Sequence, residues 1–188
     1  SNVLMINDSH FKAGIAKSDQ RKFKQLIGIT SDELLLFAIG FVRNKEVAEE
    51  IVSDVYVKIW NNRSEIENIL NLKSYLFICV RNGSLSYLRK IKNDPTISVD
   101  TFSDYHFIPV EDNNNAQIEK ETIDSIYSAI EELPAKCKLA FTLAKINGLK
   151  YCQIAEIMNI SEKTVNNHLV NAVQKITEIL NIKKRRTK

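Results

Sequence analysis

Residues 151–180 read YCQIAEIMNISEKTVNNHLVNAVQKITEIL, which is the most informative stretch of the chain. Apolar residues recur in it at the three- and four-residue spacing of a helical face, with one interruption at Asn159-Ile160. Ser161 follows the interruption, and serine is a preferred N-cap residue. The pattern predicts a short helix, a tight turn and a longer helix, which is the helix-turn-helix arrangement of many DNA-binding domains.

The longer of these two helices has one apolar face, which contains Val165, Leu169 and Ile176, and one polar face. Asparagine pairs with adenine in the major groove, threonine contacts thymine, and a lysine near a helix N-terminus suits a phosphate. The same polar face is also compatible with an ordinary solvated helix, but the turn, the cap and the basic end of the chain together favour DNA binding. The candidate DNA-contacting residues are Lys163, Thr164, Asn166, Asn167, His168, Val170 and Asn171.

The composition argues against several other classes of protein. Five glycines and three prolines in 188 residues are too few for the turns of an all-β fold. Three scattered cysteines and three scattered histidines predict no disulfide framework and no metal site, and they indicate a reducing, cytoplasmic setting. There is no glycine-rich phosphate loop or hydrolase motif, so we expect no cofactor and no enzymatic activity. The longest apolar run, from Leu34 to Val42, falls short of the ~20 residues of a membrane span, and the N-terminus shows no secretion signal.

Charge is distributed unevenly along a chain of net charge +3. Residues 17–93 carry 13 basic and 9 acidic side chains, whereas residues 94–122 carry 1 basic and 7 acidic. Residues 94–116 also lose helical periodicity, which predicts a polar, extended and mobile linker between two domains. The tail, residues 183–188, is strongly basic, and the residues alone leave open whether it frays in solvent or contacts a polyanion.

The block before the linker is also predicted to be helical. A helix is expected near Asp19–Ile27, and a second from a cap at Thr30 or Ser31 to about Arg43. Two more are expected, one from Asn44 to about Asn61 and one from about Leu72 to Ile91. The helix expected from Asn44 to about Asn61 carries acidic residues at steps of four, and such like-charge pairs cost a helix roughly 0.2–0.5 kcal/mol each. That face is either simply solvated or suited to a basic partner.

Two sets of residues resemble sigma factors of the extracytoplasmic-function class, in the sigma-70 family. The first set lies in the C-terminal block, at Leu133-Pro134, in Gly148–Ile157 and in Ile160–Leu169. The second lies in the N-terminal block, in Ala48–Trp60 and Leu72–Lys90. Their order along the chain matches the family, and the likeness covers roughly residues 20–92 and 118–182.

The resemblance implies an all-α protein of two small helical domains joined by a flexible acidic linker. Residues 17–93 would form a domain like sigma region 2, residues 94–116 the linker, residues 117–182 a helix-turn-helix domain like sigma region 4, and residues 183–188 a basic tail. The implied function is binding of core RNA polymerase and promoter-specific initiation. The first domain would melt the −10 element and the second would read the −35 element.

The family also implies roles for particular residues and partners. The candidates for docking on the clamp coiled coil of core RNA polymerase are Glu49, Glu50, Ser53 and Asp54. The candidates for the −10 element are Asn82, Ser86, Arg89 and Lys90, together with the loop at about 63–71, where a flipped base would enter a pocket. The −35 element would be read by the seven residues named above. The implied partners are core polymerase, promoter DNA and an anti-sigma factor.

A second interpretation remains open at this point. The stretch Ile160–Leu169 also resembles the output domain of quorum-sensing and response-regulator activators, which predicts a stand-alone dimeric activator. Such a protein binds its operator without polymerase. The promoter sequence, the inducing signal and the residues of the −10 base pocket are not readable from the sequence.

Overall fold

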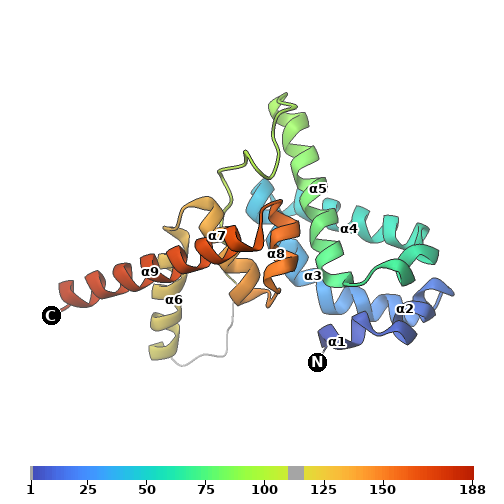
Figure 1. The fold of residues 1–188 in the computed structure, drawn as a ribbon, viewed down its shortest axis with the longest axis horizontal. Coiled ribbons are helices and arrows are strands. Elements are labelled where there is room, and N and C mark those ends of the chain that lie inside the picture. Colours follow the sequence, from blue (N-terminus) through green and yellow to red (C-terminus); the bar gives the residue numbers. More distant parts are fainter. Residues whose placement is uncertain (1, 110–116) are drawn as a thin grey trace. The chain divides into compact units, whose positions relative to one another are not determined.

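The computed structural model describes residues 2–109 and 117–188, and the chain divides into two compact units. The N-terminal unit is Ser1–Val99 and the C-terminal unit is Asp100–Lys188. Every regular element in the described residues is helical (Figure 1). The expected all-α fold of two helical domains is confirmed.

The N-terminal unit is built around three long helices. Helix α3 (Gln20–Val42) packs against both α4 (Lys45–Asn61) and α5 (Leu72–Lys92), and the 3₁₀ turn η1 (Arg63–Asn68) connects the last two. Asparagine side chains cap α4 and α5: Asn44 accepts from the Val47 N–H at 3.0 Å and Asn71 from the Ser74 N–H at 2.8 Å. The core between the helices is largely aromatic and aliphatic, and its fully buried members include Leu26, Leu34, Leu72, Leu76 and Phe77.

Helix α3 is continuous where the sequence predicted two helices. Asp19 caps its start by accepting from the Lys22 N–H at 3.2 Å. Thr30 does not cap a helix, because its hydroxyl donates to the Leu26 carbonyl at 2.8 Å and lies 2.6 Å from the hydroxyl of Tyr56. Burial raises the pKa of Tyr56 to about 12, so this buried phenol stays neutral.

Among the described residues, one helix passes the test of length and apolar composition for crossing a membrane, and this helix is α3. The apolar run Leu34–Val42 is the C-terminal part of this 23-residue helix, which begins at Gln20. Its apolar side chains pack into the core against α4 and α5, which is the behaviour of a core helix in a globular unit.

Two helices precede α3 that the sequence analysis did not predict. They are α1 (Asn2–Asn7) and α2 (Ser9–Ala16), and Asp8 caps α2 by accepting from the Phe11 N–H at 3.0 Å. Their buried residues Ile6, Phe11 and Ile15 join the core of the N-terminal unit. The folded unit therefore includes residues before 17, where the sequence placed the domain boundary.

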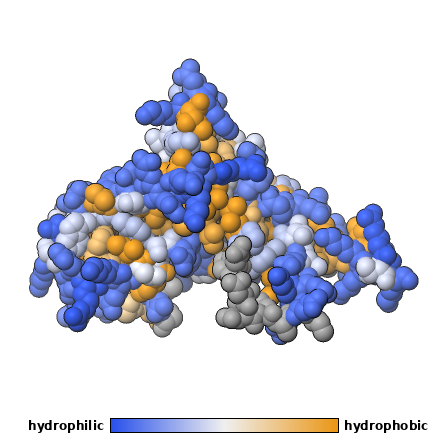
Figure 2. Space-filling model, turned by 180° about the vertical axis from the view of Figure 1, so that it is seen from behind, coloured by the Kyte–Doolittle hydropathy of each residue, from blue (hydrophilic) through white to orange (hydrophobic). Residues whose placement is uncertain are grey.

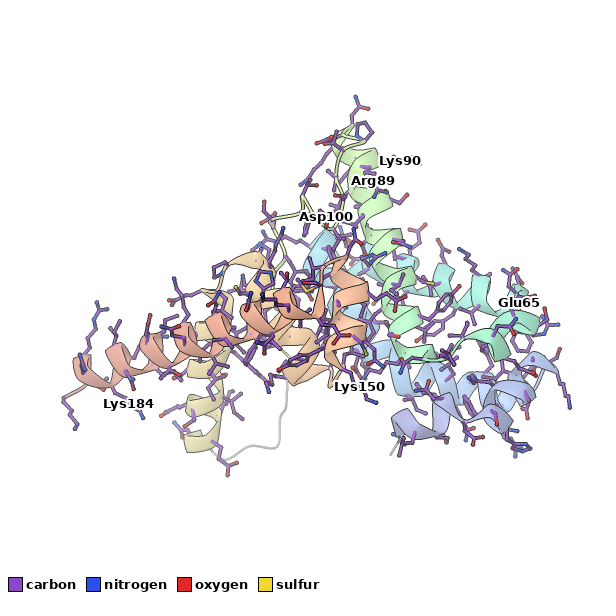
Figure 3. The ribbon with its side chains drawn as sticks, viewed as in Figure 1. Glu65, Arg89, Lys90, Asp100, Lys150 and Lys184 are labelled. Carbon is purple, nitrogen blue, oxygen red and sulfur yellow. The ribbon has the colours of Figure 1, made fainter. Side chains whose placement is uncertain are left out.

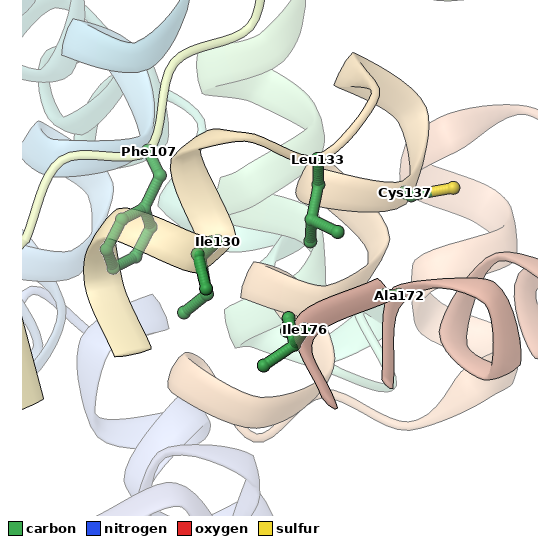
Figure 4. Packing of buried hydrophobic residues seen from close by; sticks show 7 residues of the cluster. Phe107, Ile130, Leu133, Cys137, Ala172 and Ile176 are labelled. Atoms are coloured by element: carbon green, nitrogen blue, oxygen red, sulfur yellow. The ribbon is translucent and has the colours of Figure 1, made fainter. Parts of the chain in front are cut away.

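The C-terminal unit contains α6 (Gln117–Glu131), α7 (Ala135–Phe141), the π-helical turn η2 (Thr142–Ile146), α8 (Tyr151–Met158) and α9 (Glu162–Arg186). The turn expected at Asn159 is present, with φ 55° after α8, and Gly148, with φ +66°, forms a second turn before α8. A buried cluster joins α6, α7 and α9 (Figure 4), and it consists of Phe107, Ala129, Ile130, Leu133, Cys137, Ala172 and Ile176.

The segment predicted to be a solvated linker is partly packed. Tyr105 and Phe107 are 3% and 6% exposed, and Phe107 belongs to the cluster of the C-terminal unit. Glu131 of α6 fixes the segment, since it accepts from the Phe107 N–H at 3.1 Å and lies 2.9 Å from Nδ1 of His106. Aromatic side chains at alternate positions outweigh the polar composition of this stretch. The remainder of the predicted linker, residues 110–116, lies outside the described residues.

Most of the basic tail is helical. The sequence left open whether it frays in solvent. Helix α9 continues through Lys183, Lys184, Arg185 and Arg186 and ends at Arg186. These side chains are all exposed. Cations in the last turn of a helix are favourable because they complement its dipole, so the tail extends α9 as a helical, cationic end.

Candidate nucleic-acid interface

Buried apolar side chains between α8 and α9 stabilise the helix-turn-helix. Ile154 and Ile157 of α8 and Val165 of α9 are each 0% exposed. The Ser161 hydroxyl accepts from the Thr164 N–H at 3.1 Å and caps α9, as its position after the turn predicts. The outer surface of α9 is therefore fixed in direction by a rigid core.

Most of the predicted −35 residues lie on that outer surface. Lys163, Asn166 and Asn167 are exposed, as are Val170 and Asn171, and Val170 is 56% exposed. Thr164 is only half-buried, and its hydroxyl lies 2.9 Å from the Ser161 hydroxyl. The face combines amide groups, a cation and one apolar side chain, which is a combination able to contact base edges and phosphates.

His168 is placed differently from the other predicted −35 residues. It is half-buried, and its Nδ1 lies 3.5 Å from the Cys137 thiol of α7. Burial, and then the charge of Lys136, lowers the pKa of His168, so the ring is neutral near pH 7. Position 168 is three residues after Val165 and four before Ala172, and this spacing turns it toward the core side of α9.

The acidic helix α4 borders an apolar groove in the N-terminal unit. The groove lies between α3 and α4 and has a volume of about 510 Å³. Two of the predicted polymerase-binding residues, Glu49 and Ser53, line it, beside the exposed Val57. Glu50 and Asp54 are exposed but do not line the groove, because each is one residue further round the helix.

The predicted −10 residues lie along the second half of α5. Asn82, Ser86 and Lys90 are exposed, and Asn82 accepts from its neighbour Arg81 at 2.9 Å. Arg89 is half-buried because its Nε donates to the Ile97 carbonyl at 2.6 Å, which ties the following segment to the helix. Arg89 and Lys90 stand near the end of α5 (Figure 3), and this end, uppermost in Figure 2, is mainly hydrophilic.

A second hollow lies beside η1, on which Glu65 is labelled in Figure 3. Its volume is about 280 Å³. It is lined by Lys58, Ile59, Asn62, Glu65, Ile66, Ile69 and Tyr75. The sequence indicated the loop at 63–71 but not these residues, since α4 and α5 supply several of them and only the fold brings them together.

Tyr75 is the aromatic member of this hollow. The adjacent Cys79 thiol and partial burial raise the pKa of Tyr75, so its phenol is neutral near pH 7. Burial is also the main reason that the pKa of Cys79 is raised. A neutral aromatic ring next to amide and carboxylate groups provides both a stacking surface and hydrogen-bonding groups for a planar ligand.

A capped helix-turn-helix on one unit and a helical unit with an acidic, grooved face on the other define a two-domain DNA-binding protein. Two family patterns match it: Sigma-70 region 2 over residues 30–93 and Sigma-70 region 4 over residues 123–176. The chain belongs to the sigma-70 family of RNA polymerase sigma factors, in the extracytoplasmic-function class.

Similar proteins cover nearly the whole chain. The extracytoplasmic-function sigma factor SigM of Bacillus subtilis (strain 168) is 26% identical over 80% of this chain and 90% of its own length. The RNA polymerase sigma-H factor of Pseudomonas aeruginosa is 21% identical over 92% of this chain and 93% of its own length. The sigma factor RpoE of Bartonella quintana, solved in complex with the anti-sigma factor NepR, superposes with a TM-score of 0.61 at 25% identity. It covers 86% of this chain and 98% of the solved chain.

Proposed function

We propose that the two units divide the work of promoter-specific transcription initiation, the activity of the family to which the chain belongs. The N-terminal unit binds core RNA polymerase and opens the −10 element, and the helix-turn-helix reads the −35 element. One observation carries the second half of this proposal: α9 keeps Lys163, Asn166 and Asn167 exposed while its opposite side is buried. A helix presented in this way fits the major groove.

The N-terminal unit has one surface suited to binding core polymerase and another suited to opening the −10 element. The groove between α3 and α4, with Glu49 at its border, suits an apolar helix of polymerase flanked by basic side chains. The hollow beside η1 suits a base flipped out of the duplex. There Tyr75 would stack on the base, while Asn62 and Glu65 would hydrogen-bond to its edge.

The partners of the protein are core polymerase, promoter DNA and an anti-sigma factor. The last is supported by the likeness to RpoE, which was solved bound to an anti-sigma factor. The place of action is the cytoplasm, where polymerase transcribes. The chain acts as a positioning factor that makes and breaks no covalent bond, and not as an enzyme.

Run-off transcription with purified core polymerase on genomic fragments tests this function. We expect discrete transcripts that appear only when the protein is added. A gel shift with and without core polymerase examines the stand-alone activator, which would bind tightly without the enzyme. Tight operator binding by the protein alone, with no specific start site, would contradict the proposal.

The asparagines of α9 give a sharper prediction about promoter choice. Replacing Asn166 or Asn167 with Ala should lower promoter use about 5- to 150-fold, because a bidentate amide–base pair contributes roughly 1–3 kcal/mol of discrimination. Binding to core polymerase should not change. Transcript yield from the selected promoter and a core-binding titration measure the two effects separately.

Asn181→Ala is the matched control for this pair of variants. Asn181 is also an exposed asparagine of α9, five residues before its end. It lies beyond the turns that would enter the groove, so its removal should leave promoter choice unaltered. If all three variants used the promoter equally well, Asn166 and Asn167 would not be base-reading residues.

A further inference from the structure

Side chains from α1 and α2 hydrogen-bond to the backbone at both ends of the short loop between η1 and α5. The Ile69 carbonyl accepts from Nζ of Lys12 at 2.7 Å, and the Leu72 N–H donates to the side-chain oxygen of Asn7 at 2.9 Å. The partners are 57 and 65 residues apart in the sequence. Between the two fixed points, Leu70 is 92% exposed. A short loop with both flanks tied presents one apolar side chain to solvent.

Lys12 is an unusual residue for this contact because it is only 7% exposed. Burial of an ammonium group costs free energy, and an apolar chain of similar length fills the same space at lower cost. Packing alone therefore does not explain a lysine at this position. The specific gain is a directed, charge-assisted hydrogen bond to one carbonyl of the loop.

The helices that supply Lys12 and Asn7 are themselves firmly packed. Helix α2 packs against η1, and α1 packs against α5. Phe11 and Ile15 of α2 are buried, as is Ile66 of η1 at 1% exposed. We refer to residues 2–16 as the N-terminal helix pair. Its packing gives Lys12 and Asn7 fixed positions from which to hold the loop.

We propose that the N-terminal helix pair is a positioning device for the −10 element, in which Lys12 and Asn7 hold the loop so that Leu70 meets an unstacked base. This inference rests on the proposed function of the N-terminal unit. The hollow beside η1 includes Ile69, so the tied loop is also one wall of the candidate base pocket. Apolar side chains inserted at base steps favour unstacking of the duplex. Lys12 and Asn7 act through the loop and do not touch DNA.

Lys12→Met is the principal test, because methionine keeps the chain length and removes the donor. The matched control is Lys17→Met, which removes an exposed lysine at the end of the same helix. Both are compared with the unaltered protein as polymerase holoenzyme, on a promoter found by run-off transcription. Each is assayed on the duplex promoter and on the same promoter with a mismatched, pre-opened −10 region.

We expect Lys12→Met to lower open-complex formation on the duplex about tenfold, the effect of one lost charge-assisted hydrogen bond. On the pre-opened promoter the loss should be less than about twofold, because melting is no longer required. Lys17→Met should match the unaltered protein on both. Asn7→Ala, which loosens the other flank, should repeat the pattern of Lys12→Met. Amide hydrogen exchange at Leu70 and Asn71 should become faster in both loop variants.

The results separate this inference from the proposed function. If the unaltered holoenzyme gave no promoter-specific transcript, the proposed function itself would fail. If the unaltered protein were active and Lys12→Met and Asn7→Ala behaved like Lys17→Met, the positioning role would be overturned. Equal losses on the duplex and the pre-opened promoter would also overturn it, because they would indicate a general loss of folding.

Discussion

Phe107→Ala should destabilise the C-terminal unit by about 3–4 kcal/mol, the cost of removing a buried phenylalanine from a packed core. Phe107 is 6% exposed and packs with Ile130 and Ile176 in the cluster of that unit. Its ring centroid lies 5.2 Å from that of Tyr127, in a tilted aromatic pair. Alanine at this position would leave a cavity in the cluster formed by α6, α7 and α9.

Urea unfolding followed by two signals measures this effect. The single tryptophan, Trp60, lies in α4 and reports on the N-terminal unit, whereas far-UV circular dichroism reports on the helices of both. We expect the transition of the C-terminal helices to move to lower urea, while the Trp60 transition stays in place. Ser103→Ala, in the same segment but exposed, is the control. Unchanged unfolding of Phe107→Ala would mean that residues 100–109 behave as a free linker.

The packed segment shows where sequence reasoning was limited. Asp94-Pro95, Ile108-Pro109 and the acidic side chains are typical of a solvated linker, which is what they predict for residues 94–116. Composition averages over a segment, whereas burial depends on individual side chains. Phe107 packs into the apolar cluster of the C-terminal unit, Tyr105 is also buried, and Glu131 accepts the backbone hydrogen bond of the Phe107 N–H. A pair of aromatic residues two positions apart was the signal available for this packing.

Local patterns predicted the helix-turn-helix well because its determinants are local. Asn159 takes the left-handed conformation, Ser161 forms the cap, and Val165 faces inward, as their positions in the sequence indicate. His168 is placed differently from the other six predicted −35 residues because it lies at the edge of the apolar face. The helical spacing places position 168 on the core side of α9, but its contact with Cys137 of α7 joins two helices and is not readable from the spacing within α9.

The surfaces of the N-terminal unit were less predictable because they depend on contacts between distant segments. The acidic residues of α4 were visible in the sequence, but the groove beside Glu49 exists only because α3 packs along the same side of α4. Likewise, the link from Lys12 to Ile69 joins residues separated by 57 positions. No spacing rule within a single helix indicates such a bond.

Glu49→Lys should weaken binding to core polymerase about 10- to 100-fold at low salt, because charge pairs at protein interfaces typically show coupling energies of at least ~1.5 kcal/mol. Glu49 lines the groove between α3 and α4, and its ion pair with Lys45, at 3.9 Å, is long and exposed. Asp54→Lys should have a smaller effect, since Asp54 does not line the groove. A fluorescence titration of each labelled variant with core polymerase gives the dissociation constants.

The salt dependence of binding distinguishes the contribution of the charged residues of this groove from that of its apolar residues. The defect of Glu49→Lys should shrink as ionic strength rises, because added salt screens both the lost attraction and the new repulsion. Val57→Ser, which removes an exposed apolar side chain from the same groove, should lower affinity by an amount that salt does not reduce. Glu67→Lys, on η1 and away from the groove, should bind core polymerase normally. Equal binding by Glu49→Lys and Glu67→Lys would exclude the groove as the docking surface, and the outward face of α4 with Glu50 and Asp54 would take its place.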